Sequence, residues 1–344
     1  MTLSGSRFSA EKLINFAASI LEIAGLDYEK SKVTAEILVE ADLLGHTTHG
    51  LQFLPAYIKA LEDGTMLKTG EPEVLKDSQS VILWNGNYLP GPWLVQKAID
   101  LALSRIAEHP VVTVVIQKSH HIACLAAYLQ KVAEKGLMII VSCSDPINRT
   151  VAPFGSTKGV YSPNPLAAGI PTEGKPILID VSMSATANAS IKRSNDENKK
   201  LPHPWLLDNA GGLTDDPATF YKDPPSTILP LGGLDLGYKG FALGILIEAL
   251  TGALGGYGRA EQPSVWTASV FIQVINPAAF GGTDAFIRQT QYLKDECLNA
   301  SEQVRMPGER ALALREEQKE IGIVLYPDVV KGLEDLAEKY SVAF

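Results

Sequence analysis

The sequence predicts an α+β protein in which helices from both ends of the chain form a layer around a central sheet. Apolar residues near each end recur with the 3.6-residue period of amphipathic helices. In the middle of the chain, runs of β-branched residues alternate with helical segments. The chain has 344 residues, of which 46% are hydrophobic, so it can bury a sizeable core as two domains or one large composite.

The first part of the chain predicts three helices separated by glycine-containing breaks. Ser9 is a suitable N-cap for the first helix, and Gly25 is a suitable stop. Gly45 ends the second helix, and Pro55 suits the first turn of the third. We expect the first helix between Ser9 and Gly25, the second over roughly Glu29–Leu44, and the third from about Pro55 to the Asp63-Gly64 break.

After the third helix the apolar period changes to that of strands. Strands are expected at Ser80–Trp84, Val111–Ile116, Leu137–Cys143, Ile177–Val181 and Val270–Ile275. Helices are expected at Trp93–Glu108, Ile122–Lys135, Gly240–Leu254, Ala285–Asn299, Glu309–Glu317 and Pro327–Lys339. The segment Lys192–Asp223 is polar and contains Pro, Gly and Asn, which indicates a long surface excursion.

Composition and charge exclude several classes of partner. The formal net charge is −9 and no basic stripe is visible, which disfavours nucleic acid. The N-terminal segment Met1–Lys12 lacks an apolar leader region, and the apolar stretch Phe241–Leu254 is too short to span a bilayer. We therefore expect no membrane partner.

The cysteines indicate reduced thiols. Cys124, Cys143 and Cys297 lie far apart and form no C-x-x-C pair. This spacing fits neither a disulfide framework nor a zinc site, and it is typical of a cytoplasmic protein.

No glycine fingerprint of a dinucleotide-binding fold is present. Gly256-Tyr257-Gly258 continues with Arg259-Ala260-Glu261, so the third glycine of G-x-G-x-x-G is missing. A P-loop is absent as well.

Histidines provide the clearest candidates for chemistry. Only six occur, and four form the pairs His46 with His49 and His120 with His121. The first pair follows a helix end, where unpaired carbonyls favour a cationic ring and can keep an imidazole near its switching range. The second pair follows the predicted strand Val111–Ile116. Surface or hydrogen-bonded loop histidines remain the alternative, and composition alone does not decide.

The order of short segments resembles the type 2 malate/lactate dehydrogenase-like family. This family includes lactate, malate, sulfolactate, ureidoglycolate and diketogulonate dehydrogenases and cyclic imino-acid reductases. Its A-D-L-x-G-x-x-S-H-G segment is similar to Ala41–Gly50, and its N-H-F, V-A-P-W-G, T-N-P-L and D-M-A-T-S segments have counterparts farther along. The matching segments are Ser119–Ile122, Val151–Gly155, Asn164–Ala167, Ile179–Ser184, Leu229–Gly233 with Gly237–Gly240, Asn276–Phe280 and Arg305–Arg310. Together they run in order from about Phe8 to Tyr340.

The resemblance implies a non-Rossmann fold that binds NADH or NADPH, which accounts for the missing fingerprint. It implies a helical domain from residues 1–75 with 285–344 and a central nicotinamide-binding domain, 76–284, with a largely antiparallel sheet. It also implies a homodimer that acts on a small-molecule substrate. The expected reaction interconverts a 2-oxo acid, ketone or cyclic imine with the 2-hydroxy acid or amine.

The resemblance assigns the proton donor to His49. Imidazole suits this role because its proton affinity lies near working pH. Thr48 replaces the family's serine and keeps a hydroxyl beside the ring. His121 corresponds to the second family histidine, which contacts substrate or cofactor, and His120 replaces a common asparagine.

The resemblance also indicates cofactor-binding residues, because hydroxyls, backbone amides and a lysine are suitable partners for pyrophosphate and ribose. A local turn, a solvated charge and a helix-entry turn are the structural alternatives for the three groups concerned. These candidates are Val181, Ser182, Met183, Ser184 and Thr186, then Lys239, and finally Gly308, Glu309 and Arg310.

Departures from the family pattern affect the substrate pocket. Phe53 stands where many members carry an arginine that binds the substrate carboxylate, and Pro163 replaces the threonine of T-N-P. Losing a paired guanidinium is costly when a carboxylate must be buried. Either another cation, such as Arg149 or His120, binds the anion, or the substrate is less polar near Phe53. Ala189-Ser190 replaces a pair that in some members includes an acidic catalytic partner.

Two other functional classes compete with a hydride-transfer enzyme. A metal-dependent lyase or hydrolase would use His46, His49, His121 and Asp180, but no set with metal-ligand spacing is apparent and we expect no metal. In this comparison Asp42 is expected to be a surface or capping residue. The other rival is a catalytically impaired member that still binds nicotinamide.

Overall fold

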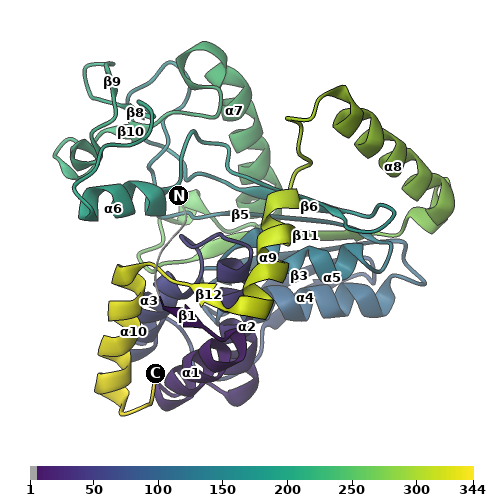
Figure 1. Cartoon of the computed structure of the whole chain (residues 1–344), viewed down its shortest axis with the longest axis horizontal. Helices are drawn as coiled ribbons and strands as arrows, with labels where there is room; N and C mark the ends of the chain where they lie inside the picture. The colour runs from purple at the N-terminus through teal and green to yellow at the C-terminus, as the bar shows by residue number, and fades with distance from the viewer. Residues whose placement is uncertain (1–5) are drawn as a thin grey trace.

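The computed structural model describes residues 6–344 (Figure 1). The first five residues of the segment that lacks an apolar leader lie outside this range. Among the described residues, no helix has both the length and the apolar character needed to cross a bilayer.

A seven-stranded sheet forms the centre, in the order β2-β3-β4-β11-β5-β6-β7. Only β3 and β4 run parallel, and the other neighbouring pairs are antiparallel, which confirms the largely antiparallel sheet. The expected strands all occur, whereas β2 and β6 were not predicted. The strands are β2 (Glu73–Asp77), β3 (Val81–Asn85), β4 (Val111–Ser119), β5 (Met138–Ser144), β6 (Leu166–Ile170), β7 (Ile177–Val181) and β11 (Ala268–Ile275).

Helices cover both faces of this sheet (Figure 1). On one face lie α4 (Gly91–Arg105) and the short α5 (Gln130–Ala133). On the other lie α7 (Gly233–Glu248) and its continuation η4 (Ala249–Ala253), which is a π-helix. The prediction over Gly240–Leu254 therefore locates this helix but begins too late.

The helical layer from both ends of the chain is present. It contains α1 (Ala10–Ile23), α2 (Tyr28–Leu43) and α3 (Leu54–Glu62), which α10 (Pro327–Tyr340) contacts through α1 and α3. The strands β1 (Arg7–Phe8) and β12 (Ile323–Val324) pair antiparallel and join the two ends. Arg315 of α9 (Glu309–Ile321) forms an ion pair with Glu40 of α2.

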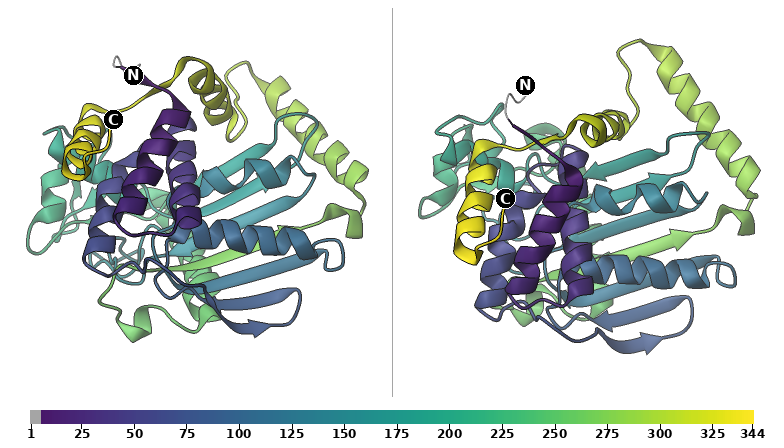
Figure 2. Two further views of the ribbon diagram at one scale, coloured as in Figure 1. Left: turned by 90° about the horizontal axis from the view of Figure 1, so that it is seen from below. Right: turned by 60° about the horizontal axis from the view of Figure 1, so that its bottom comes forward.

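The predicted helix Ala285–Asn299 was assigned to the helical layer, but it does not pack there. The helix α8 (Thr283–Ala300) has no buried residue and projects from the body, as Figures 1 and 2 show. A single core cluster also runs from the terminal helices through the sheet, so the predicted boundary near residue 75 does not separate two cores.

Two segments differ from their predictions. The expected helix Ile122–Lys135 is interrupted: residues 120–124 are not helical, Ala123 has φ 58°, and only η2 (Leu125–Tyr128) and α5 follow. The polar stretch Lys192–Asp223 is more than a surface excursion, because it begins inside a helix and then folds over a second small core. This small lobe (residues 187–229) contains α6 (Asn188–Asp196), β8 (Leu206–Leu207), β9 (Leu213–Thr214), η3 (Pro217–Tyr221) and β10 (Thr227–Ile228).

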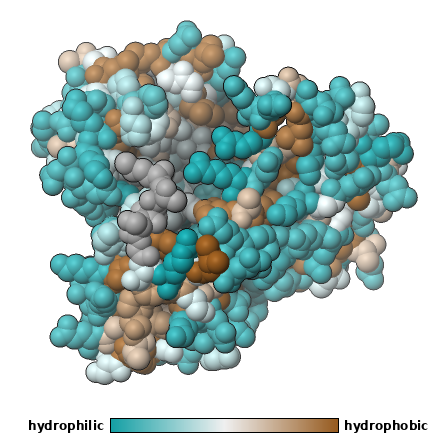
Figure 3. Space-filling view, in the orientation of Figure 1, coloured by the Kyte–Doolittle hydropathy of each residue, from teal (hydrophilic) through white to brown (hydrophobic). Residues whose placement is uncertain are grey.

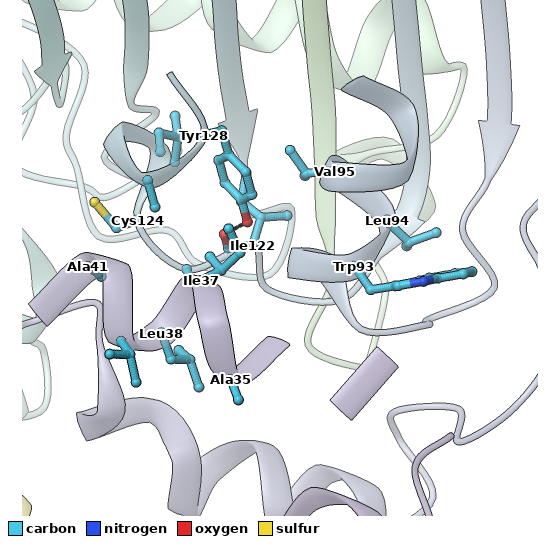
Figure 4. Close-up of a cluster of buried hydrophobic side chains, with 14 of the residues drawn as sticks. Ala35, Ile37, Leu38, Ala41, Trp93, Leu94, Val95, Ile122, Cys124 and Tyr128 are labelled. Carbon is cyan, nitrogen blue, oxygen red and sulfur yellow. Dashed lines mark hydrogen bonds between the residues drawn. The ribbon is translucent and has the colours of Figure 1, made fainter. Parts of the chain in front are cut away.

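The main core joins α2, α4 and the segment after β4 (Figure 4). Leu38 of α2 and Leu94 of α4 are fully buried in it. The Tyr128 hydroxyl donates to the Ile122 carbonyl at 2.6 Å, which fixes the segment that follows the paired histidines. This packing places that segment beside the end of α2.

Gly91 of α4 packs closely against the backbone of the paired histidines, and a substitution at Gly91 tests this packing. A Cβ at Gly91 would lie 2.3 Å from the carbonyl oxygens of both His120 and His121. We expect Gly91→Ala to displace this backbone and lower the free energy of unfolding by roughly 1–3 kcal/mol, the usual cost of overpacking. Urea unfolding measures the change.

Gly281→Ala is the matched control, because nothing lies within 4 Å of the position that its Cβ would take and its φ is not left-handed. Equal stability of the two variants would contradict this account of the packing.

Candidate active site

A cavity of about 800 Å³ lies between the end of α2, the sheet and the small lobe. This volume is in the range of small-molecule sites. Its walls come from segments that are far apart in sequence. The lining residues lie within 46–56, 121–125, 143–145, 162–165, 180–196, 220–221 and 266–268, and Asn148, Thr150 and Asp328 complete the set.

The turn that carries His49 rests on a buried carboxylate. The helix α2 ends before Gly45, whose φ is +81°. The Leu51 N–H donates to Asp42 Oδ2 at 2.8 Å, and a Cβ on Gly50 would lie 2.3 Å from Asp42 Oδ1. Gly50 is therefore required for this approach. Asp42 does cap this turn, but it is only 2% exposed, so its expected surface position is wrong.

Burial dominates the electrostatics of Asp42. Desolvation raises its pKa to about 7, against the opposing hydrogen bond from Leu51 and the charge of Arg193. A carboxylate that is forced into a low-dielectric site holds its proton more tightly.

His49 lines the cavity with one ring nitrogen held by its neighbour. Its Nδ1 lies 2.9 Å from Thr48 Oγ1. Desolvation lowers the pKa of His49 to about 4, and the charges of His46 and Arg193 act in the same direction. The expectation that the preceding helix end keeps this ring near its switching range is wrong, because burial outweighs the helix-end carbonyls.

His121 lies beside His49 in the same cavity. The two ring centroids are 6.1 Å apart, and Tyr57 Oη lies 2.8 Å from His121 Nδ1. Burial lowers the pKa of His121 well below its usual value. The structure therefore brings together the two histidines that the sequence singled out.

Aromatic rings form one wall of the cavity. The Phe53 ring lies 4.4 Å from that of His121, and Trp266 stacks on His121 at 4.9 Å. Sequence reasoning missed Trp266, because no motif marks it and it precedes β11 in an irregular segment. The wall is apolar where the family pattern places an arginine.

Neither cation suggested to replace that arginine is suitably placed. His120 is fully buried against Tyr57 and Trp266, and neither of its ring nitrogens has a hydrogen-bond partner among the described residues. Burial lowers its pKa to about 3, so it is uncharged at neutral pH. Arg149 is exposed and does not line the cavity.

The small lobe supplies cations that sequence reasoning missed. Lys192 of α6 lines the cavity. Arg193 donates to Thr47 Oγ1 at 3.0 Å and to Gln52, and its guanidinium lies 4.0 Å from the centroid of the Tyr326 ring. Arg193 thereby links α6 to both sides of the His49 turn. Ala189 also lines the cavity, as does Pro163.

A second cavity of about 490 Å³ adjoins the first, because His46 and Asp180 line both. Gly308 and Arg310 line it at the start of α9, together with Arg305. Gly308 has φ +82° and a Cβ there would lie 2.6 Å from Leu178 Cβ, so the turn needs glycine. The Glu309 carboxylate accepts from Met306 N–H at 3.0 Å and closes the turn.

The other cofactor candidates divide into two groups. Ser182 lines the main cavity, and the Ser184 hydroxyl donates to Thr186 carbonyl at 2.8 Å in a buried turn that includes Met183. In contrast, Val181 is exposed, and Lys239 is exposed on α7 and lines neither cavity.

Asp42→Asn tests the buried carboxylate beneath the His49 turn. A raised pKa means that the folded state holds the proton above pH 4, so stability falls as pH rises toward 7. We expect wild-type unfolding free energy to fall by up to about 1.4 kcal/mol per pH unit in that window from this group. The asparagine keeps an acceptor for Leu51 and should remove this part of the dependence.

Urea unfolding from pH 4.5 to 8, with Asp63→Asn as an exposed control, measures the difference. An unchanged pH dependence in Asp42→Asn would contradict the assignment.

Comparisons with known proteins agree with this architecture. A family model described as malate/L-lactate dehydrogenase matches residues 8–334. The chain is 30% identical to the malate/(S)-sulfolactate dehydrogenase of Methanothermus fervidus, over 97% of this chain and 98% of that protein. It is 30% identical to the L-lactate dehydrogenase of Cupriavidus necator, over 90% of each.

Solved structures show the same fold. Δ1-piperideine-2-carboxylate reductase from Pseudomonas syringae pathovar tomato superposes with a TM-score of 0.85 at 26% identity, covering 97% of this chain and 100% of that one. The malate dehydrogenase of Entamoeba histolytica gives 0.90 at 21% identity, over 99% of each chain, and supports the fold alone. The chain therefore belongs to the malate/L-lactate dehydrogenase family of oxidoreductases.

Proposed function

We propose that this protein is a dehydrogenase or reductase that uses NADH or NADPH to interconvert a 2-oxo acid, ketone or cyclic imine with the 2-hydroxy acid or amine. The observation that carries the proposal is His49 at the cavity wall, held by Thr48 and adjacent to His121. Carbonyl reduction needs a proton donor at the oxygen, and an imidazole with one nitrogen held can exchange a proton through the other.

The residues present fit a dinucleotide. Two adjoining cavities share His46 and Asp180, so an extended molecule can span both. Arg305 and Arg310 at the second cavity offer charges for phosphates, and Gly308 allows close backbone approach. We assign Ser182 and the turn Gly308, Glu309 and Arg310 to cofactor binding. Ser184 and Thr186 form the hydrogen-bonded turn that positions Ser182.

When bound, the nicotinamide supplies or accepts the hydride at the substrate carbon. His49 balances this by giving a proton to the carbonyl oxygen in reduction, or by taking the hydroxyl proton in oxidation. Thr48 keeps the ring oriented, and the Phe53, His121 and Trp266 rings exclude water beside it. Its low pKa leaves His49 neutral at pH 7 and ready to accept a proton.

The pH dependence of the two directions tests the role of His49. With a pKa of about 4, the ring is neutral across pH 5–8. We expect kcat/KM for oxidation to be flat over this range, whereas kcat/KM for reduction should fall about tenfold per pH unit as the protonated fraction falls. Steady-state cofactor absorbance measures both. A midpoint near 6.5 in either direction would contradict a desolvated His49.

The wall around Phe53 favours a substrate with an apolar or aromatic group. Position 53 carries no positive charge. Among the described residues, Lys192 is the one lysine or arginine that lines the main cavity. Lys192 is therefore our candidate for the substrate carboxylate.

A substrate panel with Phe53→Arg tests this pocket and the proposed activity together. Wild type should prefer aromatic or branched 2-oxo acids over oxaloacetate. The guanidinium in Phe53→Arg should raise kcat/KM for oxaloacetate roughly tenfold to a hundredfold, the value of a hydrogen bond to a charged group. Phe53→Leu is the control that keeps an apolar wall.

Cofactor oxidation against pyruvate, oxaloacetate, phenylpyruvate and a cyclic imine provides the measurement. Wild-type preference for oxaloacetate would overturn the altered pocket. Cofactor binding without turnover on the whole panel would identify a catalytically impaired member instead.

We also propose a homodimer formed through the exposed apolar faces of α7 and α8. Leu234, Ile245 and Leu246 of α7 are half exposed, and Tyr292 and Leu293 of α8 are more so. Figure 3 shows apolar residues reaching the surface of the upper part of the molecule, in the orientation where α7 lies at the top. A second copy would bury faces that a single chain leaves in water.

Light scattering after gel filtration tests the dimer with Leu246→Glu. The charge should convert a dimer of the 37.0 kDa chain into a monomer. Leu213→Glu, on the exposed strand β9, should leave the dimer intact. A monomeric wild type would overturn the proposal.

We further infer a reducing compartment such as the cytoplasm, because all three cysteines are free and Cys124 and Cys143 line the cavity.

A further inference from the structure

Three metal-ligating side chains converge where the two cavities meet. His46 follows α2, Cys124 follows β4, and Asp180 lies near the end of β7. Their potential ligand atoms all lie within 4.8 Å of one another. Among the described residues no other group of histidines, cysteines and carboxylates meets this way.

The separations suit a tetrahedral ion. Zinc binds sulfur at about 2.3 Å and nitrogen or oxygen at about 2.0–2.1 Å, so its ligand atoms lie roughly 3.3–3.6 Å apart. Cys124 Sγ and Asp180 Oδ2 already lie 3.6 Å apart. Closing the remaining edges requires only a shift of about an ångström or a rotation of the half-buried His46 ring.

Part of the site is held in place before any ion binds. Asp180 Oδ2 accepts from the Ala126 N–H at 2.9 Å, and Cys124 is buried in the main core cluster (Figure 4). Because His46 and Asp180 line both cavities and Cys124 lines the larger one, a hydrated ion can reach all three. His49 and His121 are engaged with Thr48 and Tyr57 instead, so the ligand set differs from the one considered from sequence.

We propose that His46, Cys124 and Asp180 bind a divalent cation of the zinc class, and that the filled site inhibits the enzyme. The neutral imidazole, the thiolate and the carboxylate give nitrogen, sulfur and oxygen ligands, a set that suits zinc, and water completes the fourth position. Binding replaces the Cys124 S–H bond by an S–metal bond and releases one proton to solvent. The two anionic ligands then balance the ion's charge.

Inhibition follows from the position of the ion. One of its ligands, His46, is three residues before His49 in the sequence, and the charge of His46 already lowers the pKa of His49. A bound cation would act in the same direction. An ion at the junction would also obstruct a molecule that spans both cavities. The enzyme requires no metal in this account, so chelation should leave turnover intact.

Cobalt binding tests the site without reference to activity. Titration of the full-length, chelator-treated protein with Co²⁺ should give one equivalent with a thiolate-to-cobalt charge-transfer band. Cys124→Ala should lose the band, and His46→Gln and Asp180→Asn should weaken binding at least roughly tenfold to a hundredfold, as metal-site changes do. Asp180→Asn keeps an acceptor for Ala126. Competition with Zn²⁺ gives the zinc affinity.

Cys297→Ser and Cys143→Ser are the thiol controls and should retain the band. A wild-type protein without the band, or a band that persists in Cys124→Ala, would overturn the site. Zinc should inhibit wild type reversibly on addition of chelator, with sensitivity lowered at least roughly tenfold in Cys124→Ala. Equal zinc inhibition of both proteins would overturn the link to inhibition, whereas the cobalt result stands apart from the proposed dehydrogenase reaction.

Discussion

The contact between Tyr57 and His121 holds the candidate site together. Tyr57 lies on α3 in the N-terminal helical layer, and His121 follows the central strand β4. Their 2.8 Å contact, with a second hydrogen bond from the tyrosine hydroxyl to the His121 carbonyl, joins the helical layer to the sheet. Phe53 and Trp266 pack on the same imidazole, and all three rings line the cavity. The contact therefore lies beside the place where His49, which follows α2, meets His121, which follows β4.

Desolvation then determines the charge state of the site. Burial lowers the pKa of His49, His120 and His121, and it raises the pKa of Asp42. The imidazoles of His49 and His121, which lie nearest the proposed reaction, are therefore neutral. The Asp42 carboxyl beneath the His49 turn is itself easily protonated. An apolar, low-charge pocket suits proton exchange at a substrate oxygen, but it offers little to a second carboxylate on the substrate. Phe53 in place of an arginine is consistent with this electrostatic character.

Sequence periodicity was sufficient for most of the fold because the long elements bury one regular face. The helices at both ends and the strand Val111–Ser119 follow directly from such patterns. The segment Ile122–Lys135 was predicted wrongly as one helix, since its apolar residues are buried against several neighbours while Ala123 adopts a left-handed conformation. Edge strand β2 is exposed throughout and has no apolar alternation to detect.

For the site, family resemblance led to His49 and His121, which the structure places together. Lys192 and Arg193 could not be predicted, because their position depends on how the small lobe folds over the cavity. Trp266 was missed because no motif marks it in the irregular segment before β11. The convergence of His46, Cys124 and Asp180 could not be predicted either, because they come from three segments that only the tertiary fold brings together. Asp42 was expected to be a surface or capping residue, and it caps the His49 turn from a buried position. Its burial could not be predicted, because it depends on the close approach of Gly50 in the folded chain.

The alanine variant of His49 tests most directly whether this residue exchanges the proton in the reaction. For wild type and His49→Ala, kcat would be measured on the best substrate of the panel, together with cofactor affinity by fluorescence titration. The account predicts a loss in kcat of about 10²–10⁴-fold, the usual contribution of a general acid or base, with cofactor affinity within a few-fold of wild type. Full turnover by His49→Ala would contradict it.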